Sequence, residues 1–500
     1  MPCLLLCLAL TCLFVRGQSA LCNVLSRGAK GGGGGDDTAA LQRVFDDPSC
    51  SELVFPAGHA FSASVLWVRR SDVTVTLEAN ATLAGLPATF LAGRPDCASE
   101  DGLEFNWKDW CALLRITAES NVTIRGAGTI APGGTGGVAP NFYSALHVRS
   151  TTGVTLQGVR VHCTAWWWCT VLHNATGVLV TSVFVDGSTG RDAMDLVNCR
   201  DVVVEHSRIE GSDDALCIKS ISNDGLGGFP SRDTVVRNCS ISSTWDNAIQ
   251  FGSATEVDMT NFTFTGVTVS TARKSAIGIV SMDGANISKL RFENITVDGP
   301  DVATPLFVKI GNRVGCEDRK GTCWRPGSIA DVNFTNMTAN GWGNVSNPTR
   351  GHSASYTATV EGLNASYRVG PIRIDGLELV APGGGTAADA KVDPPISPLQ
   401  YQPRYDGLRP AYGLFIRYAR DVTIAGSSVG VTAGEQDGRP AIVADEVDGL
   451  VLSGVTVAAD LATCQIEQRK STVTAPNLQS CVWAPNAPNA PPPPTDAVPR

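Results

Sequence analysis

Aromatic side chains are scarce in this sequence, and it contains only one long apolar run. Phe, Trp and Tyr make up 7% of the 500 residues, so the core must consist mainly of Val, Ile, Leu and Ala. The apolar run at residues 3–15 is too short to span a bilayer and has the position of a signal peptide. We therefore predict that residues 1–20 are removed and that the mature chain is secreted, extracellular and free of the membrane.

Clusters of Lys and Arg are also missing, and the formal net charge is −9. Nucleic-acid binding therefore has no support from the sequence. An acidic surface attracts polyanions poorly, so a polyuronate would have to be held by a few local cations. No CxxC or Cys/His spacing typical of zinc occurs, and we expect neither a metal nor a cofactor.

Cysteines and glycosylation sequons are abundant by contrast, and both are typical of the secretory route. Three of the 16 cysteines lie in the signal peptide, so 13 remain and at least one thiol must be free. Proximity suggests the bridges Cys22–Cys50, Cys97–Cys111, Cys163–Cys169, Cys316–Cys323 and Cys464–Cys481, which leaves Cys199, Cys217 and Cys239. The 11 sequons, some of which could simply be turn residues, are at Asn80, Asn121, Asn174, Asn238, Asn261, Asn286, Asn294, Asn333, Asn336, Asn344 and Asn364.

One short pattern recurs between residues 73 and 457. It consists of two half-strands broken by a polar residue or Gly, as in GVTLQGVRV (153–161), DVVVEHSRI (201–209) and GLVLSGVTV (449–457). Each copy alternates apolar and polar residues, which is the period of a β-strand. A coil of this length cannot bury its apolar side alone, but stacked coils form parallel sheets around one core. The pattern predicts an all-β solenoid of about ten or more coils.

A β-sandwich or propeller is the competing architecture, but hairpin turn dipeptides are scarce between the copies. No amphipathic helix of useful length separates the strands, so βαβ units have little support. The best short helix lies at residues 36–47, with Asp36 or Asp37 as its cap. It would cover the N-terminal end of the solenoid with a stripe made of Ala39, Leu41, Val44 and Phe45.

The rest of the chain is predicted to consist of one domain, a long loop within it and a C-terminal tail. Residues 21–482 are predicted to form one β-helix domain, and residues 381–410 form a long irregular loop within it. Residues 483–500 are a Pro-rich tail without a means of packing. We expect a monomer whose only partner is its polysaccharide substrate.

Carboxylates end two consecutive repeats, at Asp192 and Asp195 and then at Asp213 and Asp214. Asp192 and Asp213 are 21 residues apart, which is close to one coil. Because one coil advances by about 4.8 Å, Asp192 should lie almost directly beneath the Asp213–Asp214 pair. Acids this close repel one another, so at least one pKa should rise. A protonated acid beside an ionised one is what glycosidic cleavage requires.

Two segments resemble a known family at this point. GSDDALCIKS (211–220) and RDAMD (191–195) are similar to the Gly-x-Asp-Asp and Asn-Thr-Asp-Gly-hydrophobic-Asp segments of polygalacturonases, glycoside hydrolase family 28. The resemblance extends from about residue 25 to residue 380. It implies a right-handed parallel β-helix and an inverting hydrolase, with Asp213 as general acid and with Asp192 and Asp214 activating water. In an inverting pair the carboxyls should be ~6.5–9.5 Å apart.

The chain departs from the family at three places. Gly190-Arg191 replaces Asn-Thr, STWDNAIQFGS (243–253) carries no His-Gly, and IGIVSM (277–282) replaces Arg-Ile-Lys. The lost basic pair would hold a galacturonate carboxylate. Candidates for substrate binding in this chain are Arg191, Lys219, Trp168, Asp246, Lys309 and Arg313.

The sequence thus predicts a secreted glycoside hydrolase that cleaves a pectic or related acidic polysaccharide. Two alternatives remain. A β-helix polysaccharide lyase would require a Ca²⁺ site and a basic residue as its base. A catalytically inactive, wall-glycan-binding β-helix would retain the scaffold without the reaction.

Overall fold

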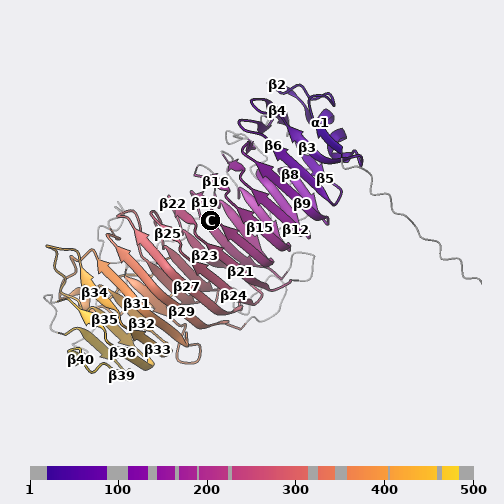
Figure 1. Cartoon of the computed structure of the whole chain (residues 1–500). Helices are drawn as coiled ribbons and strands as arrows, with labels where there is room; N and C mark the ends of the chain where they lie inside the picture. Colours follow the sequence, from indigo (N-terminus) through magenta and orange to yellow (C-terminus); the bar gives the residue numbers. More distant parts are fainter. Residues whose placement is uncertain are drawn as a thin grey trace, which may run out of the picture. The chain divides into compact units, whose positions relative to one another are not determined.

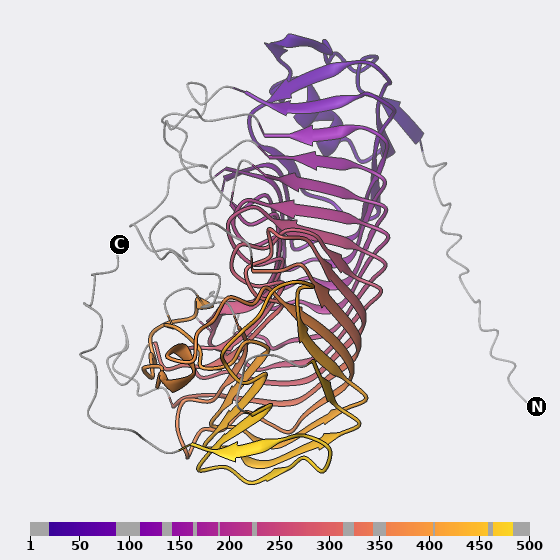
Figure 2. The same ribbon diagram turned by 90° about the vertical axis from the view of Figure 1, so that its left-hand side faces the viewer.

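The computed structural model describes residues 20–86, 111–132, 143–163, 168–188, 191–222, 228–313, 325–343, 357–403, 406–458 and 464–483. Residues 1–19 of the expected signal peptide and residues 484–500 of the Pro-rich tail lie outside the described residues. So do Cys97, Cys316 and Cys323, and the bridges Cys97–Cys111 and Cys316–Cys323 stay predictions. The chain divides into two compact units, Met1–Gln250 and Phe251–Arg500. Both consist of parallel strands stacked coil upon coil, as Figures 1 and 2 show, and the chain is a right-handed parallel β-helix. The predicted fold class is confirmed.

In the first unit each coil contributes strands to two sheets, called sheet A and sheet B. Sheet B contains β5 (Leu66–Val68), β8 (Cys111–Thr117), β11 (Tyr143–Arg149), β14 (Thr170–His173), β17 (Met194–Val197) and β20 (Leu216–Ser220). Sheet A contains β1 (Ala20–Asn23), β2 (Gly32–Asp36), β3 (Cys50–Phe55), β4 (Ala60–Ala63), β6 (Val73–Leu77), β7 (Thr82–Gly85), β9 (Ser120–Gly126), β10 (Thr129–Ala131), β12 (Thr152–Gln157), β13 (Arg160–His162), β15 (Thr176–Thr181), β16 (Phe184–Gly187), β18 (Arg200–Glu205), β19 (Arg208–Gly211), β21 (Ser231–Arg237) and β22 (Ser240–Ser243).

The second unit repeats this plan, and β23 (Ile249–Thr255) contains the boundary between the units. Its sheet B strands are β26 (Ile277–Ser281), β28 (Leu306–Ile310), β30 (Ala358–Glu361), β32 (Leu414–Arg417), β35 (Ile442–Asp445), β38 (Ile466–Arg469) and β40 (Ser480–Val482). Its sheet A strands are β24 (Met259–Thr265), β25 (Thr268–Val269), β27 (Asn286–Asp298), β29 (Ser328–Asn340), β31 (Ile372–Ala381), β33 (Arg420–Ala425), β34 (Ser428–Val431), β36 (Asp448–Ser453), β37 (Thr456–Val457) and β39 (Val473–Thr474).

The polar or Gly residue between two half-strands is a corner of the coil. In four successive coils of the first unit this position has a φ between 50° and 75°, at Gly158, Ser182, His206 and Asn238. Gly adopts such a φ without strain, and Asn tolerates it better than most residues. Seven of the sequon asparagines also have positive φ, namely Asn80, Asn121, Asn174, Asn238, Asn261, Asn294 and Asn336. Corner geometry therefore explains these asparagines independently of glycosylation.

The core consists mainly of Val, Ile, Leu and Ala, as the composition predicts. A short column of aromatic rings interrupts it in the second unit. There Phe264, Phe292 and Phe334 from successive coils stack with ring centroids 4.9–5.0 Å apart. This distance is close to the strand spacing, because stacked coils place equivalent side chains directly above one another.

The predicted helix is α1 (Thr38–Asp46), and it buries Leu41, Val44 and Phe45. Ala39 is exposed, so its assignment to the apolar stripe was wrong. Gln42 accepts a hydrogen bond from the Trp67 backbone N–H at 2.9 Å and donates one to the Trp67 carbonyl at 3.0 Å. The helix thereby satisfies backbone groups of β5, the first strand of sheet B, as expected for a cover of the N-terminal end.

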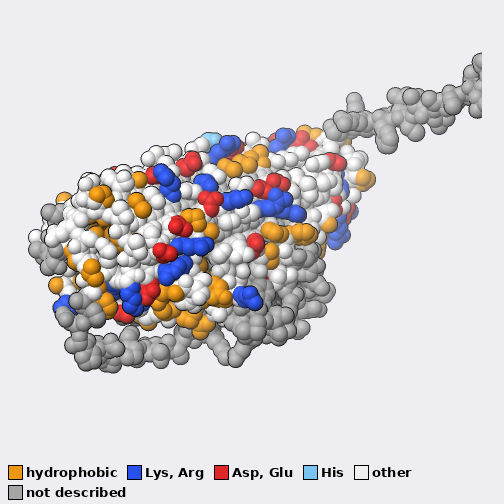
Figure 3. All heavy atoms as spheres, turned by 90° about the horizontal axis from the view of Figure 1, so that it is seen from below, with side chains coloured by type: hydrophobic (Ala, Val, Ile, Leu, Met, Phe, Trp, Pro, Cys, Tyr) orange, Lys and Arg blue, Asp and Glu red, His pale blue; other side chains and the backbone are white. Residues whose placement is uncertain are grey.

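Three predicted disulfides are present, Cys22–Cys50, Cys163–Cys169 and Cys464–Cys481. Cys199, Cys217 and Cys239, which the predicted bridges leave over, are buried and take part in none of these disulfides. On the face shown in Figure 3, Lys and Arg side chains alternate with Asp and Glu and do not gather into one cationic patch. Arg125–Glu52 and Arg237–Glu205 are two ion pairs between partly exposed side chains of the first unit.

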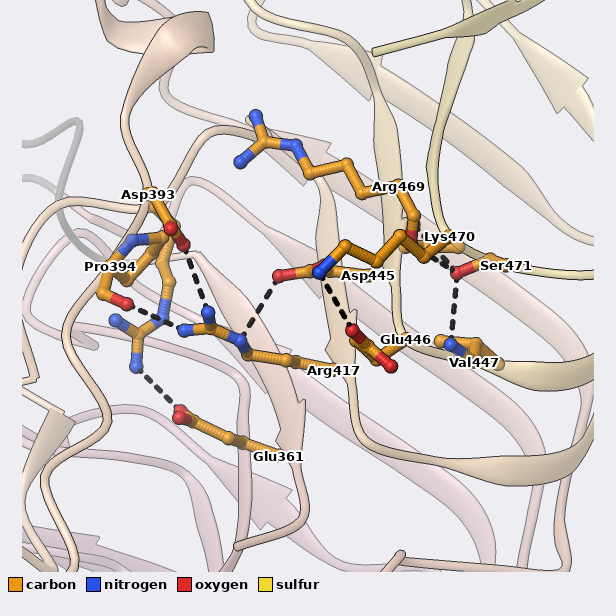
Figure 4. A network of polar contacts seen from close by, with 12 residues as sticks. Glu361, Asp393, Pro394, Arg417, Asp445, Glu446, Val447, Arg469, Lys470 and Ser471 are labelled. Atoms are coloured by element: carbon orange, nitrogen blue, oxygen red, sulfur yellow. Dashed lines mark hydrogen bonds and ion pairs between the residues drawn. The ribbon is translucent and has the colours of Figure 1, made fainter. Parts of the chain in front are cut away.

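In the predicted irregular loop at residues 381–410, Ala381 ends β31 and Asp389–Lys391 form a short 3₁₀ turn. We call this loop the strap, because basic residues of sheet B hold it. Arg417 donates to the Pro394 carbonyl and to Asp393, and its Nε lies 3.0 Å from Asp445 (Figure 4). Arg469 donates to the carbonyls of Ala390 and Val392, both at 2.8 Å.

The charges beneath the strap alternate along one column of sheet B. Parallel pairing aligns Lys309, Glu361, Arg417, Asp445 and Arg469 in successive strands. All five are buried. Burial raises the pKa of Asp445, although Arg417 acts in the opposite direction. Arg417 and Asp445 form an ion pair within the column, whereas Lys309, Glu361 and Arg469 pair with Asp406, Arg409 and Glu467. Each buried charge therefore depends on an opposite charge beside it.

This dependence predicts a large effect on stability. Arg417→Met should lower the free energy of unfolding by about 3–5 kcal/mol, because it leaves the buried Asp445 carboxylate without its ion partner. Adding Asp445→Leu to the same chain should recover part of the loss. Arg373→Met, which breaks the exposed Arg373–Asp375 pair, is the matched control and should cost less than about 1 kcal/mol. Equal losses in urea unfolding for Arg417→Met and Arg373→Met would contradict the analysis.

Candidate active site

The acidic cluster is formed by two stacked turns of the first unit. Asp192 precedes β17, and Asp213 and Asp214 precede β20, which pairs with β17 in parallel. Backbone hydrogen bonds connect the turns, from Asp213 N–H to the Arg191 carbonyl at 3.2 Å and from Ala193 N–H to the Asp214 carbonyl at 3.0 Å. One oxygen from each of Asp192, Asp213 and Asp214 lies within 4.8 Å of the other two. The one-coil spacing therefore brings the three carboxyls together, as predicted.

The exposure of the three carboxyls differs. Asp192 is buried at 3% exposed, whereas Asp213 and Asp214 are partly exposed. The Nε atom of Arg191 lies 3.6 Å from Oδ2 of Asp213, and both side chains are about one-third exposed. Asp213, Asp214 and Arg191 are therefore the groups of the cluster that solvent reaches. The 4.8 Å limit is a distance between single oxygens and does not give the separation of the carboxyl groups. The separation expected for an inverting pair, ~6.5–9.5 Å, therefore stays a prediction.

Lys219, on β20, occupies the interior of the cluster. Its Nζ is 2.6 Å from Oδ2 of Asp192 and also donates to Asp195, which is completely buried. The same ammonium donates to the Cys217 sulfur at 2.9 Å and lies 3.9 Å from the centre of the Trp168 ring. Lys219 is 5% exposed. Its contacts are internal, and a direct role toward substrate stays a prediction.

Burial dominates the protonation of this interior. It raises the pKa of Asp192 well above the ordinary value, against the attraction of Lys219, and Asp195, Asp213 and Asp214 add to the rise. Burial likewise raises the pKa of Asp195 to about 6. Burial alone would lower the pKa of Lys219, but Asp192 and Asp195 reverse this and raise it well above its usual value. A raised acid was predicted, but desolvation is a larger cause than repulsion between the acids.

The next coil contacts the cluster through Asn247, a residue that the sequence reasoning did not select. Its side-chain amide donates to Oδ1 of Asp214 at 2.8 Å, and its backbone N–H donates to the same oxygen at 3.2 Å. Asn247 lies in the segment where the family resemblance would place His-Gly. Its position in the turn before the next strand, equivalent to that of Asp214 before β20, was the available signal.

The other predicted binding residues lie in different surroundings. Trp168 is 7% exposed and packs against Lys219, and Trp166 and Trp167 fall outside the described residues. Asp246 is 9% exposed, and its backbone N–H donates to the Ser243 hydroxyl at 2.9 Å. Of the predicted set, Arg191 and Lys219 contact the acids and Trp168 packs on Lys219. Asp246 belongs to the turn whose next residue, Asn247, binds Asp214.

Lys309 and Arg313 belong to the second unit, and each has an acidic partner there. The Lys309 ammonium is 2.6 Å from both carboxylate oxygens of Asp406 in the strap, and it is 2% exposed. Arg313 donates to both oxygens of Asp283 at 3.0 and 2.6 Å. Sequence reasoning could not find Asp406, because 97 residues separate it from Lys309.

The ligand atoms of two acidic groupings lie close enough together to bind a metal ion, but the Lys219 ammonium already donates to residues of both. Asp192 belongs both to the grouping with Asp195 and Cys217 and to the grouping with Asp213 and Asp214. Lys219 donates to three of these five residues, which supplies the positive charge that a cation would otherwise bring. A third grouping contains Cys464 and Cys481, whose sulfurs form a disulfide.

Comparisons with known proteins support the architecture. The family described as right handed beta helix region matches residues 144–311. A family 28 exopolygalacturonase from Yersinia enterocolitica is 15% identical, with a TM-score of 0.53 over 89% of this chain and 79% of that chain. A hyperthermoactive exopolygalacturonase from Thermotoga maritima is 14% identical, with a TM-score of 0.46 over 91% and 92%. A surface adhesin of Streptococcus pneumoniae is 11% identical, with a TM-score of 0.46 over 91% and 100%.

None of the curated proteins matches the sequence. At 15% identity the likeness to the Yersinia enterocolitica structure shows a shared fold alone, so the chemistry has to be argued from the residues of this chain. The three disulfides are compatible with an oxidising, secretory environment. Among the described residues, no helix is long and apolar enough to cross a membrane.

The buried Lys219 cluster predicts a pH-dependent stability. Carboxyls whose pKa is raised in the folded chain keep a proton that the unfolded chain releases, so they lose stability as the pH rises through the raised pKa. Lys219→Met removes the attraction that offsets burial and should extend this loss to higher pH. We expect the melting temperature of Lys219→Met to fall below that of the unaltered chain increasingly from about pH 4 to about pH 8.

Arg208→Met, which removes an exposed cation paired with Glu210, is the control for this experiment and should leave the pH profile unchanged. A constant difference between Lys219→Met and the unaltered chain at every pH would rule out the titration of Asp192 and Asp195 as the cause.

Proposed function

We propose that the chain is a secreted glycoside hydrolase that cleaves a pectic or related acidic polysaccharide with inversion. The observation that carries the proposal is the convergence of Asp192, Asp213 and Asp214, two of them partly exposed, above an interior with raised pKa values. Such an arrangement supplies carboxyls in different protonation states, which acid–base cleavage of a glycosidic bond requires.

The proposed roles are those that the family resemblance implies, and the exposure and contacts of the residues are compatible with them. Asp213, the general acid that the resemblance implies, is partly exposed and belongs to a turn that solvent reaches. Asp214 and Asp192 are the proposed activators of water. Two hydrogen bonds from Asn247 fix the orientation of Asp214, and Lys219 does the same for Asp192 from beneath.

The proposed substrate charge rests on Arg191. It is the cation beside the exposed carboxyls, whereas Lys219 and Lys309 are buried against acids. A guanidinium binds a carboxylate more strongly than other side chains do, so Arg191 is suited to a uronate. The net charge of −9 adds no long-range attraction, which makes this local cation decisive.

Asp213→Asn tests the hydrolase. The unaltered chain should release reducing ends from pectic polysaccharides with inverted anomeric configuration, and Asp213→Asn should reduce kcat by about 10²- to 10⁴-fold because the leaving oxygen is no longer protonated. The pH profile of kcat/KM should be bell-shaped, since an acid must keep its proton while the raised pKa of Asp192 requires higher pH for ionisation.

The controls for this experiment separate the rival functions. Asp375→Asn, at an exposed carboxyl of the second unit, should leave activity unchanged. Activity that a Ca²⁺ chelator abolishes, with unsaturated products, would identify a lyase and overturn the proposal. Binding of pectin without any product, equally in both aspartate variants, would identify a non-enzymatic glycan-binding protein.

The missing basic pair predicts a shift in substrate preference. We expect kcat/KM on unmodified polygalacturonate to be lower than on substituted or rhamnose-containing pectin, because the basic pair that would hold a galacturonate carboxylate is missing from residues 277–282. Arg191→Gln should lower kcat/KM on the acidic substrate more than on a neutral one. Rapid cleavage of polygalacturonate, undiminished in Arg191→Gln, Lys219→Met, Lys309→Met and Arg313→Gln, would refute the electrostatic argument.

A further inference from the structure

Trp245 is the most exposed described Trp or Phe side chain, with 61% of its surface accessible. A single exposed apolar side chain is ordinary on a protein surface and implies nothing alone. Its place in the chain distinguishes Trp245, because it lies in the turn between β22 and β23 that also carries Asn247. The residues on both sides of the indole contact the acidic turn.

Several hydrogen bonds fix this turn against the acids. The Thr244 backbone N–H donates to the Gly211 carbonyl at 3.0 Å, and the Ser243 hydroxyl donates to the Asp213 carbonyl. On the other side of Trp245, Asn247 donates twice to the Asp214 carboxylate. Since two residues of chain span at most about 7 Å, the Trp245 backbone lies close to both anchor points.

Gly211 makes the approach of the two turns possible. A Cβ atom at this position would lie 2.7–3.0 Å from backbone atoms of Asp213, Asp214 and Ala215. Real Cβ atoms do not come so close, so only glycine lets the chain pass here while its carbonyl accepts from Thr244. The position of Trp245 is thus determined by the same turn that presents the carboxyls.

We propose that Trp245 is a stacking platform for a pyranose ring of the polysaccharide, next to the Asp213–Asp214 pair. The proposal rests on the proposed function for the identity of the ligand. An indole offers a broad, rigid apolar face that loses little conformational entropy, and the C–H face of a pyranose ring is its complement. Trp168, the indole predicted for this role, packs against Lys219 and is buried.

A platform at this place assigns two tasks to one turn. Asn247 orients the carboxylate that faces water, while Trp245 holds the plane of the sugar beside it. Stacking is insensitive to charge, so the platform accepts neutral and acidic sugars alike and leaves discrimination to Arg191. It also provides binding energy where long-range attraction is absent, at a net charge of −9.

The experiment measures binding and turnover separately. Calorimetry with the Asp213→Asn chain should show that Trp245→Ala weakens the affinity for oligogalacturonate and for rhamnose-containing pectin oligosaccharides by about 10- to 100-fold. The affinity of the Trp245→Phe chain should lie between those of the Trp245→Ala chain and its parent. In the chain with Asp213 intact, Trp245→Ala should raise KM more than it lowers kcat, because stacking is present before and during bond cleavage.

Phe229→Ala is the matched control. Phe229 is the other exposed described aromatic of the first unit, 37% exposed, and it packs against Arg200. Its removal should change affinity by less than about twofold. Melting temperatures of all variants should agree, because both rings are exposed.

The outcomes separate the platform from the hydrolase. Weaker binding by Trp245→Ala supports the platform even where the unaltered chain hydrolyses nothing, a result that would overturn the proposed function alone. Equal affinities of Trp245→Ala and its parent chain, with hydrolysis intact, overturn the platform and leave the hydrolase. Absence of both binding and hydrolysis for every pectic oligosaccharide overturns both.

Discussion

The buried ammonium of Lys219 is the interaction on which the candidate site depends. Asp192 and Asp195 are both buried, and desolvation raises the pKa of each. Without a nearby cation, two carboxyls in so dry an environment would remain protonated, because ionising both would create two buried charges that repel each other. Lys219 comes from the next coil, so its ion pairs also connect β17 to β20. The turn that presents Asp213 and Asp214 therefore lies above an ammonium that is paired with two buried carboxyls.

A general constraint of the parallel β-helix explains why charges are arranged in this way. Coils stacked in register place equivalent side chains about 4.8 Å apart, so a column of like charges would repel along its whole length. Under the strap the column alternates in sign from Lys309 to Arg469. Beside the acids, the column of Asp195 continues with the uncharged Cys217. In both places the register, more than the composition, determines which charges can be buried.

The candidate site differs from the pattern of the family that its sequence resembles. The exposed acids, Asp213 and Asp214, are present, but Asn247 occupies the coil in which a histidine would be expected. Arg191 is the cation beside them, in place of the basic pair missing from residues 277–282. A shared fold at 15% identity permits such replacements, because the coils are stabilised by corners and core positions that the site does not use. We therefore propose that the specificity of this chain depends on Arg191, Asn247 and Trp245.

The sequence by itself determined the solenoid and the convergence of the acids, because both depend on a period that is local. The corner position that Asn238 occupies recurs in successive coils. The spacing of 21 residues brings Asp213 above Asp192. The partners of Lys219 and Lys309 were decided only by the tertiary structure. Whether a cation points toward solvent or into a carboxylate depends on burial and on loops of irregular length, as the 97 residues between Lys309 and Asp406 illustrate. Such contacts leave no periodic signal, so only the folded chain could show that both lysines are bound internally.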